Sequence, residues 1–196
     1  MLGLQGESIC GVKGDMGRFE IKELTVSDWE SYKKVRLASL KDSPDSFSST
    51  YEREQAFSEA DWKARLRPQP GVNISFPLVA ESHGNIVGLA SGVIWEEDST
   101  VAHVYQMWVL PESRGKGIAT ALLKSITAWA EVSGCESMKL VVTATNEPAA
   151  SLYRSFGFNP SGRLEPLREG SVLETQPMVK KLGNFDFGHN SIELEQ

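Results

Sequence analysis

The chain has 196 residues, a mass of 21.6 kDa and 40% hydrophobic residues, enough for one domain with its own core. Its 17 glycines, 9 prolines and 23% charged residues exclude collagen-like, coiled-coil and wholly disordered chains. The formal net charge of −6 argues against a general nucleic-acid coat, and no apolar run approaches the roughly 20 residues of a membrane helix. We therefore predict a soluble protein that has neither nucleic acid nor membrane as a partner.

The N-terminal segment and the cysteines set the expected context. Residues 1–17 carry several glycines without periodicity, which predicts a flexible lead-in, and Met16 is an alternative natural start. The segment lacks the basic and apolar regions of a secretory signal, so a cytoplasmic location follows by default. Cys10 and Cys135 lie in no metal-ligand spacing and are too few for a disulfide framework, so we expect free thiols and no metal.

The first half of the chain predicts a strand, two helices and a run of antiparallel strands. Capping-box patterns at Ser27 and Ser58 open the two helices, the first running to about Leu40 and the second ending before Pro68. The residue pattern predicts strands at 19–24, 78–81, 86–94 and 102–110, the middle two forming a hairpin about a turn at 83–85.

The second half predicts a helix from Ile118 to about Gly134, because apolar residues recur there at helical spacing. A strand at 138–144, a helix at 148–155 and a last strand at 174–182 follow. The order predicts an α/β fold of the α+β type, with a mixed sheet flanked by helices, over residues 18–182. The tail at 183–196 shows no obvious core face.

The loop at 111–120, between a predicted strand and a predicted helix, carries the chemistry. Its glycines let the backbone approach a ligand, and the free N–H groups of a helix start attract anions, so a diphosphate would fit. An ordinary glycine-bearing turn is the alternative. A Walker A loop fails because Gly117 follows Lys116, and a dinucleotide fingerprint fails because Thr120 stands where glycine is needed.

The pattern Arg114-x-x-Gly117-x-Ala119, which reads RGKGIA here, resembles the signature of the GNAT superfamily of acyl-CoA-dependent N-acetyltransferases. The resemblance covers residues 19–182 and implies a mostly antiparallel sheet with splayed central strands. It also implies that acetyl-CoA is the cosubstrate. The loop amides that would wrap its pyrophosphate, opened by Arg114, are those of Gly115, Lys116, Gly117, Ile118, Ala119 and Thr120.

The same resemblance implies roles for residues on either side of this loop. The backbone of Met107, Trp108 and Val109 would pair with the pantetheine arm, in a gap beside the strand that begins at Met138. Asn146 would touch the pantetheine, and Tyr153, seven residues further on, matches the family's general acid. Seven residues are nearly two helical turns, which would bring both side chains to one helix face.

The reaction itself assigns further tasks. Spare N–H groups at Met107 to Val109 are candidates for holding the oxyanion. Tyr153 has an ordinary pKa of about 10 and would donate a proton to the leaving thiolate. Its alternative is an aromatic core residue near Phe156 and Phe158. Neither cysteine is placed to form an acyl-enzyme, which favours direct transfer.

The general base is less well defined, since the strand before the signature has no carboxylate at 102–106. His103 is a candidate that alternation puts on the face of Tyr105 and Met107. A packed or surface histidine is the alternative, and a water relay ending at Glu81 or Glu96 is another.

The resemblance places the acceptor groove at the first two helices and the hairpin loops. Acidic residues there would attract a cationic amine, or they form a solvated face. They are Glu52, Glu54, Glu59, Asp61, Glu96, Glu97 and Asp98. The function expected is acetyl transfer from acetyl-CoA to a primary amine of a small molecule or peptide. A catalytically inactive acyl-CoA-binding or sensing module is the alternative, and similar proteins are often homodimers.

Overall fold

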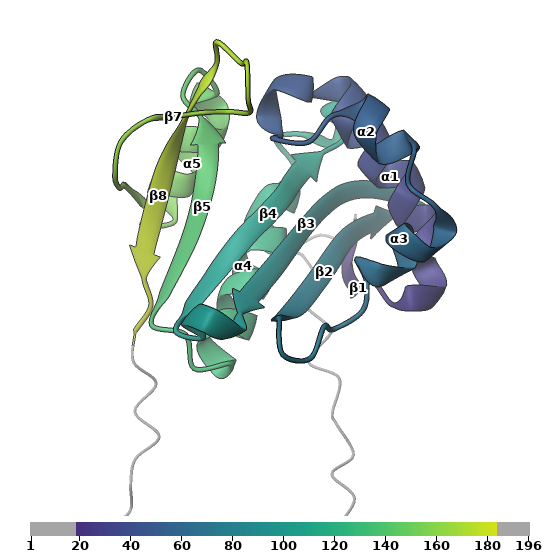
Figure 1. Cartoon of the computed structure of the whole chain (residues 1–196), viewed down its shortest axis with the longest axis horizontal. Helices are drawn as coiled ribbons and strands as arrows, with labels where there is room; N and C mark the ends of the chain where they lie inside the picture. Colours follow the sequence, from purple (N-terminus) through teal and green to yellow (C-terminus); the bar gives the residue numbers. More distant parts are fainter. Residues whose placement is uncertain (1–18, 184–196) are drawn as a thin grey trace, which may run out of the picture.

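A computed structural model describes residues 19–183, which form one mixed sheet covered by helices (Figure 1). Its eight strands follow the order β1-β2-β3-β4-β5-β8-β6, with β7 also paired to β8. Every pairing is antiparallel except β4 with β5, which confirms the predicted mixed, mostly antiparallel sheet. The strands are β1 (Glu20–Glu23), β2 (Asn73–Ser82), β3 (Asn85–Trp95), β4 (Val101–Val109), β5 (Ser137–Thr143), β6 (Asn159–Pro160), β7 (Glu165–Pro166) and β8 (Glu174–Lys181).

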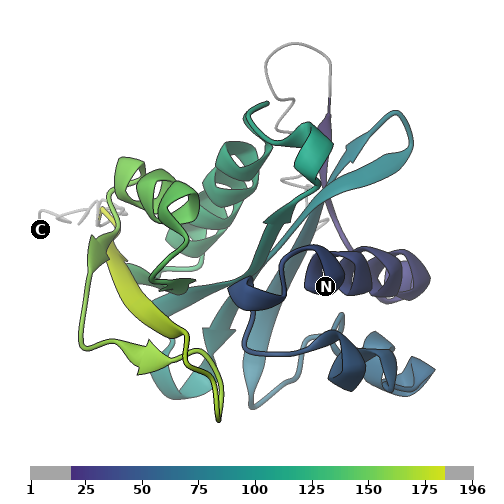
Figure 2. The same ribbon diagram turned by 90° about the horizontal axis from the view of Figure 1, so that it is seen from above.

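Helices cover both faces of the sheet, one group on each side (Figure 2). The first face carries α1 (Trp29–Asp42), α2 (Tyr51–Gln55) and α3 (Glu59–Ala64), and the second carries α4 (Ile118–Val132) and α5 (Glu147–Ser155). The predicted helix opening at Ser58 is α3, whose N-terminus is closed by a complete capping box. Helix α2 was not predicted, because its sequence YEREQ is too short and polar to show helical periodicity.

Each helix layer packs on its own hydrophobic cluster, and the strand β3 contributes to both. Leu89 belongs to the cluster under α1 and α3, whereas Ala90 belongs to the cluster under α4 and α5. Glycine lets α4 lie close to this strand. A Cβ at Gly88 would come within 2.8 Å of Ile118 Cγ2, and one at Gly92 within 2.7 Å of Trp129 Cζ3.

The central strands β4 and β5 pair only at their beginnings and then separate (Figure 1). Their parallel register ends at His103 opposite Lys139. This confirms the splayed central strands. Beyond that point β4 also contains a bulge, because its register with β3 shifts between Leu89 and Ser91, and Gln106 adopts a φ of 58°.

Residues 1–18 and 184–196 lie outside the described part of the chain, and with them the predicted lead-in and nearly all of the predicted tail. Between residues 19 and 183, no helix combines the length and apolar character needed to cross a membrane.

Candidate active site

A cavity of about 930 Å³ lies where β4 and β5 separate. Its walls come from both sides of the sheet, because Tyr153 lines it from α5, Met107 from β4, and Tyr32 and Arg53 from α1 and α2. The cavity therefore joins the two faces through the gap between the strands. Of the residues expected at the site, it brings together Met107, His103 and Tyr153.

The signature loop lies directly beyond β4 and has the open backbone that the sequence predicts. Gly115 and Gly117 have φ angles of 74° and 80°, which favour glycine, and Gly117 occupies the N-cap of α4. Within residues 19–183, no protein atom accepts a hydrogen bond from the backbone N–H groups of residues 115–120. These N–H groups remain available to an anion.

The two basic side chains of the loop have partners of their own. Arg114 donates from Nη2 to Asp42 Oδ2 at 2.6 Å and from Nε to the Val109 carbonyl at 3.0 Å. Burial raises the pKa of Asp42, but hydrogen bonds from Ser43 and Trp108 and the Arg114 charge outweigh it, so the net pKa is below the ordinary value. Lys116 Nζ donates to the Glu112 carbonyl at 2.7 Å.

The backbone of β4 has different partners at successive residues. The Leu110 N–H donates to the Val87 carbonyl at 2.9 Å, so Leu110 and, by alternation, Trp108 face β3. Val109 and Met107 then face the gap, in agreement with the Arg114 contact on the Val109 carbonyl. Trp108 differs from the expectation: its backbone faces β3, and its indole is buried against Asp42.

Tyr153 is buried on α5 with 7% of its surface exposed, and it lines the cavity. Its ring meets Phe158 edge-on, with ring centroids 6.1 Å apart, so the expected aromatic packing is also present. Burial raises the pKa of Tyr153 to about 12. Within the described chain its hydroxyl has no hydrogen-bond partner, which leaves it free to donate to a ligand in the cavity.

His103 lines the cavity on the face that carries α1, stacked on Tyr105 with ring centroids 5.9 Å apart. Burial and the Lys139 charge lower its pKa, although Asp98 opposes this shift. The expectation that Met107 shares this face is wrong, because the bulge at Gln106 breaks the alternation and turns Met107 toward the α4 core.

The three other polar residues considered for the site lie outside the cavity. Asn146 caps α5 by accepting from the Ala149 N–H at 3.2 Å, and its Nδ2 lies 3.4 Å from Ser46 Oγ. Glu81 forms an ion pair with Lys22 at 2.8 Å. Neither Glu81 nor Glu96 lines the cavity, so the structure does not support a water relay through them.

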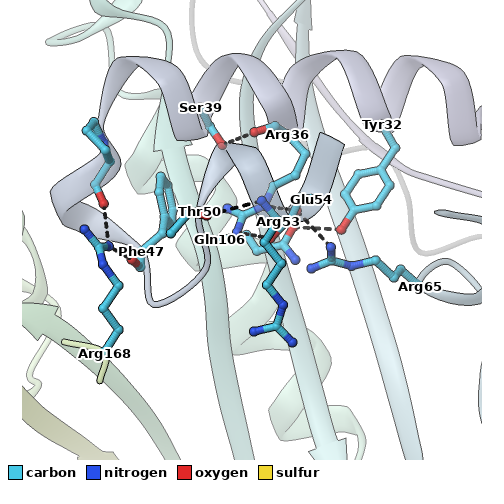
Figure 3. Close-up of polar contacts among 11 residues, drawn as sticks. Tyr32, Arg36, Ser39, Phe47, Thr50, Arg53, Glu54, Arg65, Gln106 and Arg168 are labelled. Atoms are coloured by element: carbon cyan, nitrogen blue, oxygen red, sulfur yellow. Dashed lines mark hydrogen bonds and ion pairs between the residues drawn. The ribbon is translucent and has the colours of Figure 1, made fainter. Parts of the chain in front are cut away.

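An ion-pair network that sequence reasoning missed holds the α1 to α3 side of the cavity (Figure 3). The Arg36 guanidinium donates to Glu54 at 2.8 and 3.0 Å, and Arg65 Nη1 donates to the same carboxylate at 2.8 Å. Burial raises the pKa of Glu54, but the hydrogen bond and charge of Arg36 and the charge of Arg65 outweigh it and lower the net pKa. A charged residue on the buried face of α1, one turn after Tyr32, was the available signal.

The predicted acidic groove is largely absent from the cavity. Of the seven acidic residues expected there, only Glu54 and Asp61 line it. Asp61 accepts hydrogen bonds from the Ser58 N–H and hydroxyl, which closes the N-terminus of α3. The alternative of a solvated face therefore fits the others.

The loop between α1 and α2 is tied to segments far along the chain. Arg168 Nη1 donates to the Pro44 and Phe47 carbonyls at 3.1 and 3.0 Å. The Thr143 hydroxyl, at the end of β5, donates to the Asp45 carbonyl at 2.5 Å. These contacts place the loop beside the gap between β4 and β5.

The separated strands β4 and β5 and the open, glycine-bearing loop before α4 together form the arrangement that the resemblance implies for an acyl-CoA-dependent transferase. Residues 36–158 match the Acetyltransferase (GNAT) family. The chain therefore belongs to this family, whose members use acetyl-CoA as cosubstrate, and residues 36–158 form its acetyltransferase domain. No group of side chains that could hold a metal occurs within residues 19–183.

Individual relatives support the same assignment. N-acetylaspartate synthetase from Homo sapiens is 39% identical over 84 residues, which are 43% of this chain and 28% of the relative. The enzyme of the same name from Danio rerio is 29% identical over 118 residues, 60% of this chain and 41% of the relative. The chain thus spans less than half the length of these relatives.

Solved structures resemble the fold over more of the chain. An acetyltransferase of the GNAT family from Streptococcus pneumoniae superposes with a TM-score of 0.70 and 18% identity, covering 84% of this chain and 99% of that one. At this identity the likeness establishes the fold.

Proposed function

We propose that the protein transfers the acetyl group of acetyl-CoA to a primary amine of a small molecule or peptide, by direct attack within a ternary complex. The observation that carries this proposal is the continuity of β4. Its Val109 carbonyl contacts the signature-loop residue Arg114, and its Met107 lines the cavity that contains Tyr153.

In this proposal acetyl-CoA lies along β4. The free amides of Gly115, Lys116, Gly117, Ile118, Ala119 and Thr120 bind the pyrophosphate, and the half-exposed Arg114 adds charge. The backbone of Met107 and Val109, which faces the gap, pairs with the pantetheine arm. Asn146 stays a predicted pantetheine contact, and its Nδ2 would leave Ser46 to make it.

The chemistry assigns one task to each group in the cavity. A neutral amine attacks the thioester carbonyl, and N–H groups of β4 stabilise the oxyanion. His103, whose lowered pKa keeps it neutral at pH 7, accepts the proton that the amine loses. When the intermediate collapses and the carbon–sulfur bond breaks, Tyr153 donates its proton to the thiolate. Burial that raises the pKa of Tyr153 also raises that of a thiol beside it.

A thiol-release assay with acetyl-CoA and a panel of amines tests this function. We expect free CoA to appear in proportion to the amine acetylated, with aspartate, small amines and short peptides in the panel. The second candidate, an inactive acyl-CoA-binding module, predicts calorimetric heat with acetyl-CoA but no thiol with any amine. Absence of binding would contradict both.

Two further expectations accompany the proposal, a homodimer and a cytoplasmic location. Light scattering of the purified chain tests the first. Fractionation of the source cell tests the second.

A further inference from the structure

The cavity wall is positively charged although the whole chain is negative. The basic side chains that line it are Arg36, Arg53, Arg65, Arg67 and Lys139, and the acidic ones are Glu54, Asp61 and Glu165. With His103 neutral, five positive and three negative charges leave a net of +2, against −6 for the chain. A concave wall of one sign attracts ligands of the opposite sign.

The acidic side chains are mostly engaged, whereas several basic ones are free. Glu54 is fully buried and shared by Arg36 and Arg65, and Asp61 is bonded to Ser58. Within residues 19–183, the guanidinium groups of Arg53 and Arg67 and the Lys139 ammonium have no ion-pair partner. Glu165 is the remaining acid of the cavity wall. The unpaired charge of the wall is therefore mainly cationic.

Arg53 is the best placed of these cations. It lies in α2 next to Glu54, whose buried ion pairs fix the position of this short helix. Figure 3 shows the Arg53 guanidinium pointing away from that network, with no dashed line joining it to the other residues drawn. A guanidinium offers a planar fork of N–H donors that matches a carboxylate with two parallel hydrogen bonds.

Buried polar atoms in the same wall also lack partners. Arg36 is 3% exposed, yet among residues 19–183 its Nη1 finds no hydrogen-bond partner, and neither does the buried Ser75 Oγ on β2. Both residues line the cavity. Because buried unsatisfied donors are costly, the wall is suited to a ligand that brings acceptor oxygens.

We propose that the acceptor is an amino carboxylic acid, and that Arg53 binds its carboxylate while its amine faces the gap beside β4. The inference rests on the proposed function and specifies its substrate. A cationic wall disfavours an ammonium ion, which lowers the pKa of the bound amine and favours its neutral, nucleophilic form. The carboxylate supplies the binding that the amine alone would lack.

Matched acceptors that differ only in the carboxylate test this assignment. Each amino acid is compared with its α-carboxamide, and aspartate with asparagine, in the thiol-release assay. For the wild type we expect kcat/KM to favour the carboxylate by about 10- to 100-fold. In Arg53→Ala the carboxylate substrate should lose about that factor, chiefly through KM, while the amide changes less than about twofold.

Two variants separate charge recognition from folding. Arg53→Lys keeps the charge without the planar fork and should fall between the wild type and Arg53→Ala. Lys34→Ala removes an exposed charge of α1 outside the cavity and should leave kcat/KM unchanged for both substrates. Circular dichroism checks that all variants fold.

The assignment would be overturned if the wild type preferred carboxamides or polyamines, or if Arg53→Ala lost the same factor in kcat/KM for carboxylate and carboxamide acceptors. Thiol release with any of these amines would still support the proposed function. If no amine released thiol, the proposed function would fail first, and the assignment with it.

Discussion

The signature loop and the cavity beside β4 are built by different means. The signature loop presents the free backbone N–H groups of consecutive residues, 115–120, whose geometry two glycines provide. The proposed acceptor side presents side chains from several elements, with a buried network joining Arg36, Glu54 and Arg65. A cosubstrate common to a family can be held by backbone geometry, whereas acceptor choice can depend on side chains outside the buried network, such as Arg53.

We expect the largest effect when the buried Glu54 carboxylate of this network is removed. We expect Glu54→Ala to lower the free energy of unfolding by about 3–5 kcal/mol, because Arg36 would stay buried without its counter-charge. Urea denaturation measures this loss. Glu59→Ala, which removes the exposed partner of Lys63 in the neighbouring helix, should cost far less. Equal losses in the two variants would refute the structural role of the network.

Tyr153→Phe tests the chemistry inside the cavity. Losing the hydroxyl should lower turnover about 100-fold, the scale of one general acid, and leave the acetyl-CoA Kd within about twofold. Stopped assays and calorimetry measure the two quantities. Tyr51→Phe, in α2 and outside the cavity, is the control and should keep wild-type turnover. Unchanged turnover in Tyr153→Phe would leave only its packing role against Phe158.

Gly117→Ala tests whether the backbone conformation of the signature loop contributes to acetyl-CoA binding. Its φ of 80° is unfavourable for alanine, so we expect about 1 kcal/mol of lost stability and roughly tenfold weaker acetyl-CoA binding. Gly134→Ala is a matched control, since Gly134 has the same φ of 80° at the other end of α4. Both variants should lose similar stability, and only Gly117→Ala should bind acetyl-CoA less well. Equal affinities would contradict a phosphate site at this turn.

The smallest effect concerns pH. The pKa of His103 is lowered below 6.5, so the side chain is neutral at pH 7 and gains a proton only at more acidic pH. We expect kcat/KM to fall there, and His103→Asn to abolish this inflection. Stability should also decline as pH drops below 6.5, because the unfolded chain then binds the proton more readily. His83→Asn, at the exposed β2–β3 turn, should keep the wild-type profile, and an inflection that survived in His103→Asn would exclude His103 as the base.

The sequence predicted features that depend on neighbouring residues and missed those that depend on distant ones. The position of the signature loop between β4 and α4, the helix α4 itself and the β2–β3 hairpin were predicted correctly, because each has its own turn or periodicity signal. The bulge at Gln106 has no such signal, and it moved Met107 to the other face of the sheet. Arg36 and Glu54 look like surface charges in one dimension and become a buried pair only when α1 and α2 pack together.

The hydrogen bonds from Arg168 to the loop between α1 and α2 have a consequence for the order of folding. Arg168 binds carbonyls 124 and 121 residues earlier, and Thr143 binds one 98 residues earlier. Such contacts close very long segments and form late. During synthesis from the N-terminus, the cavity that α1 to α3 border can therefore take its final shape only after Thr143 and Arg168 have emerged.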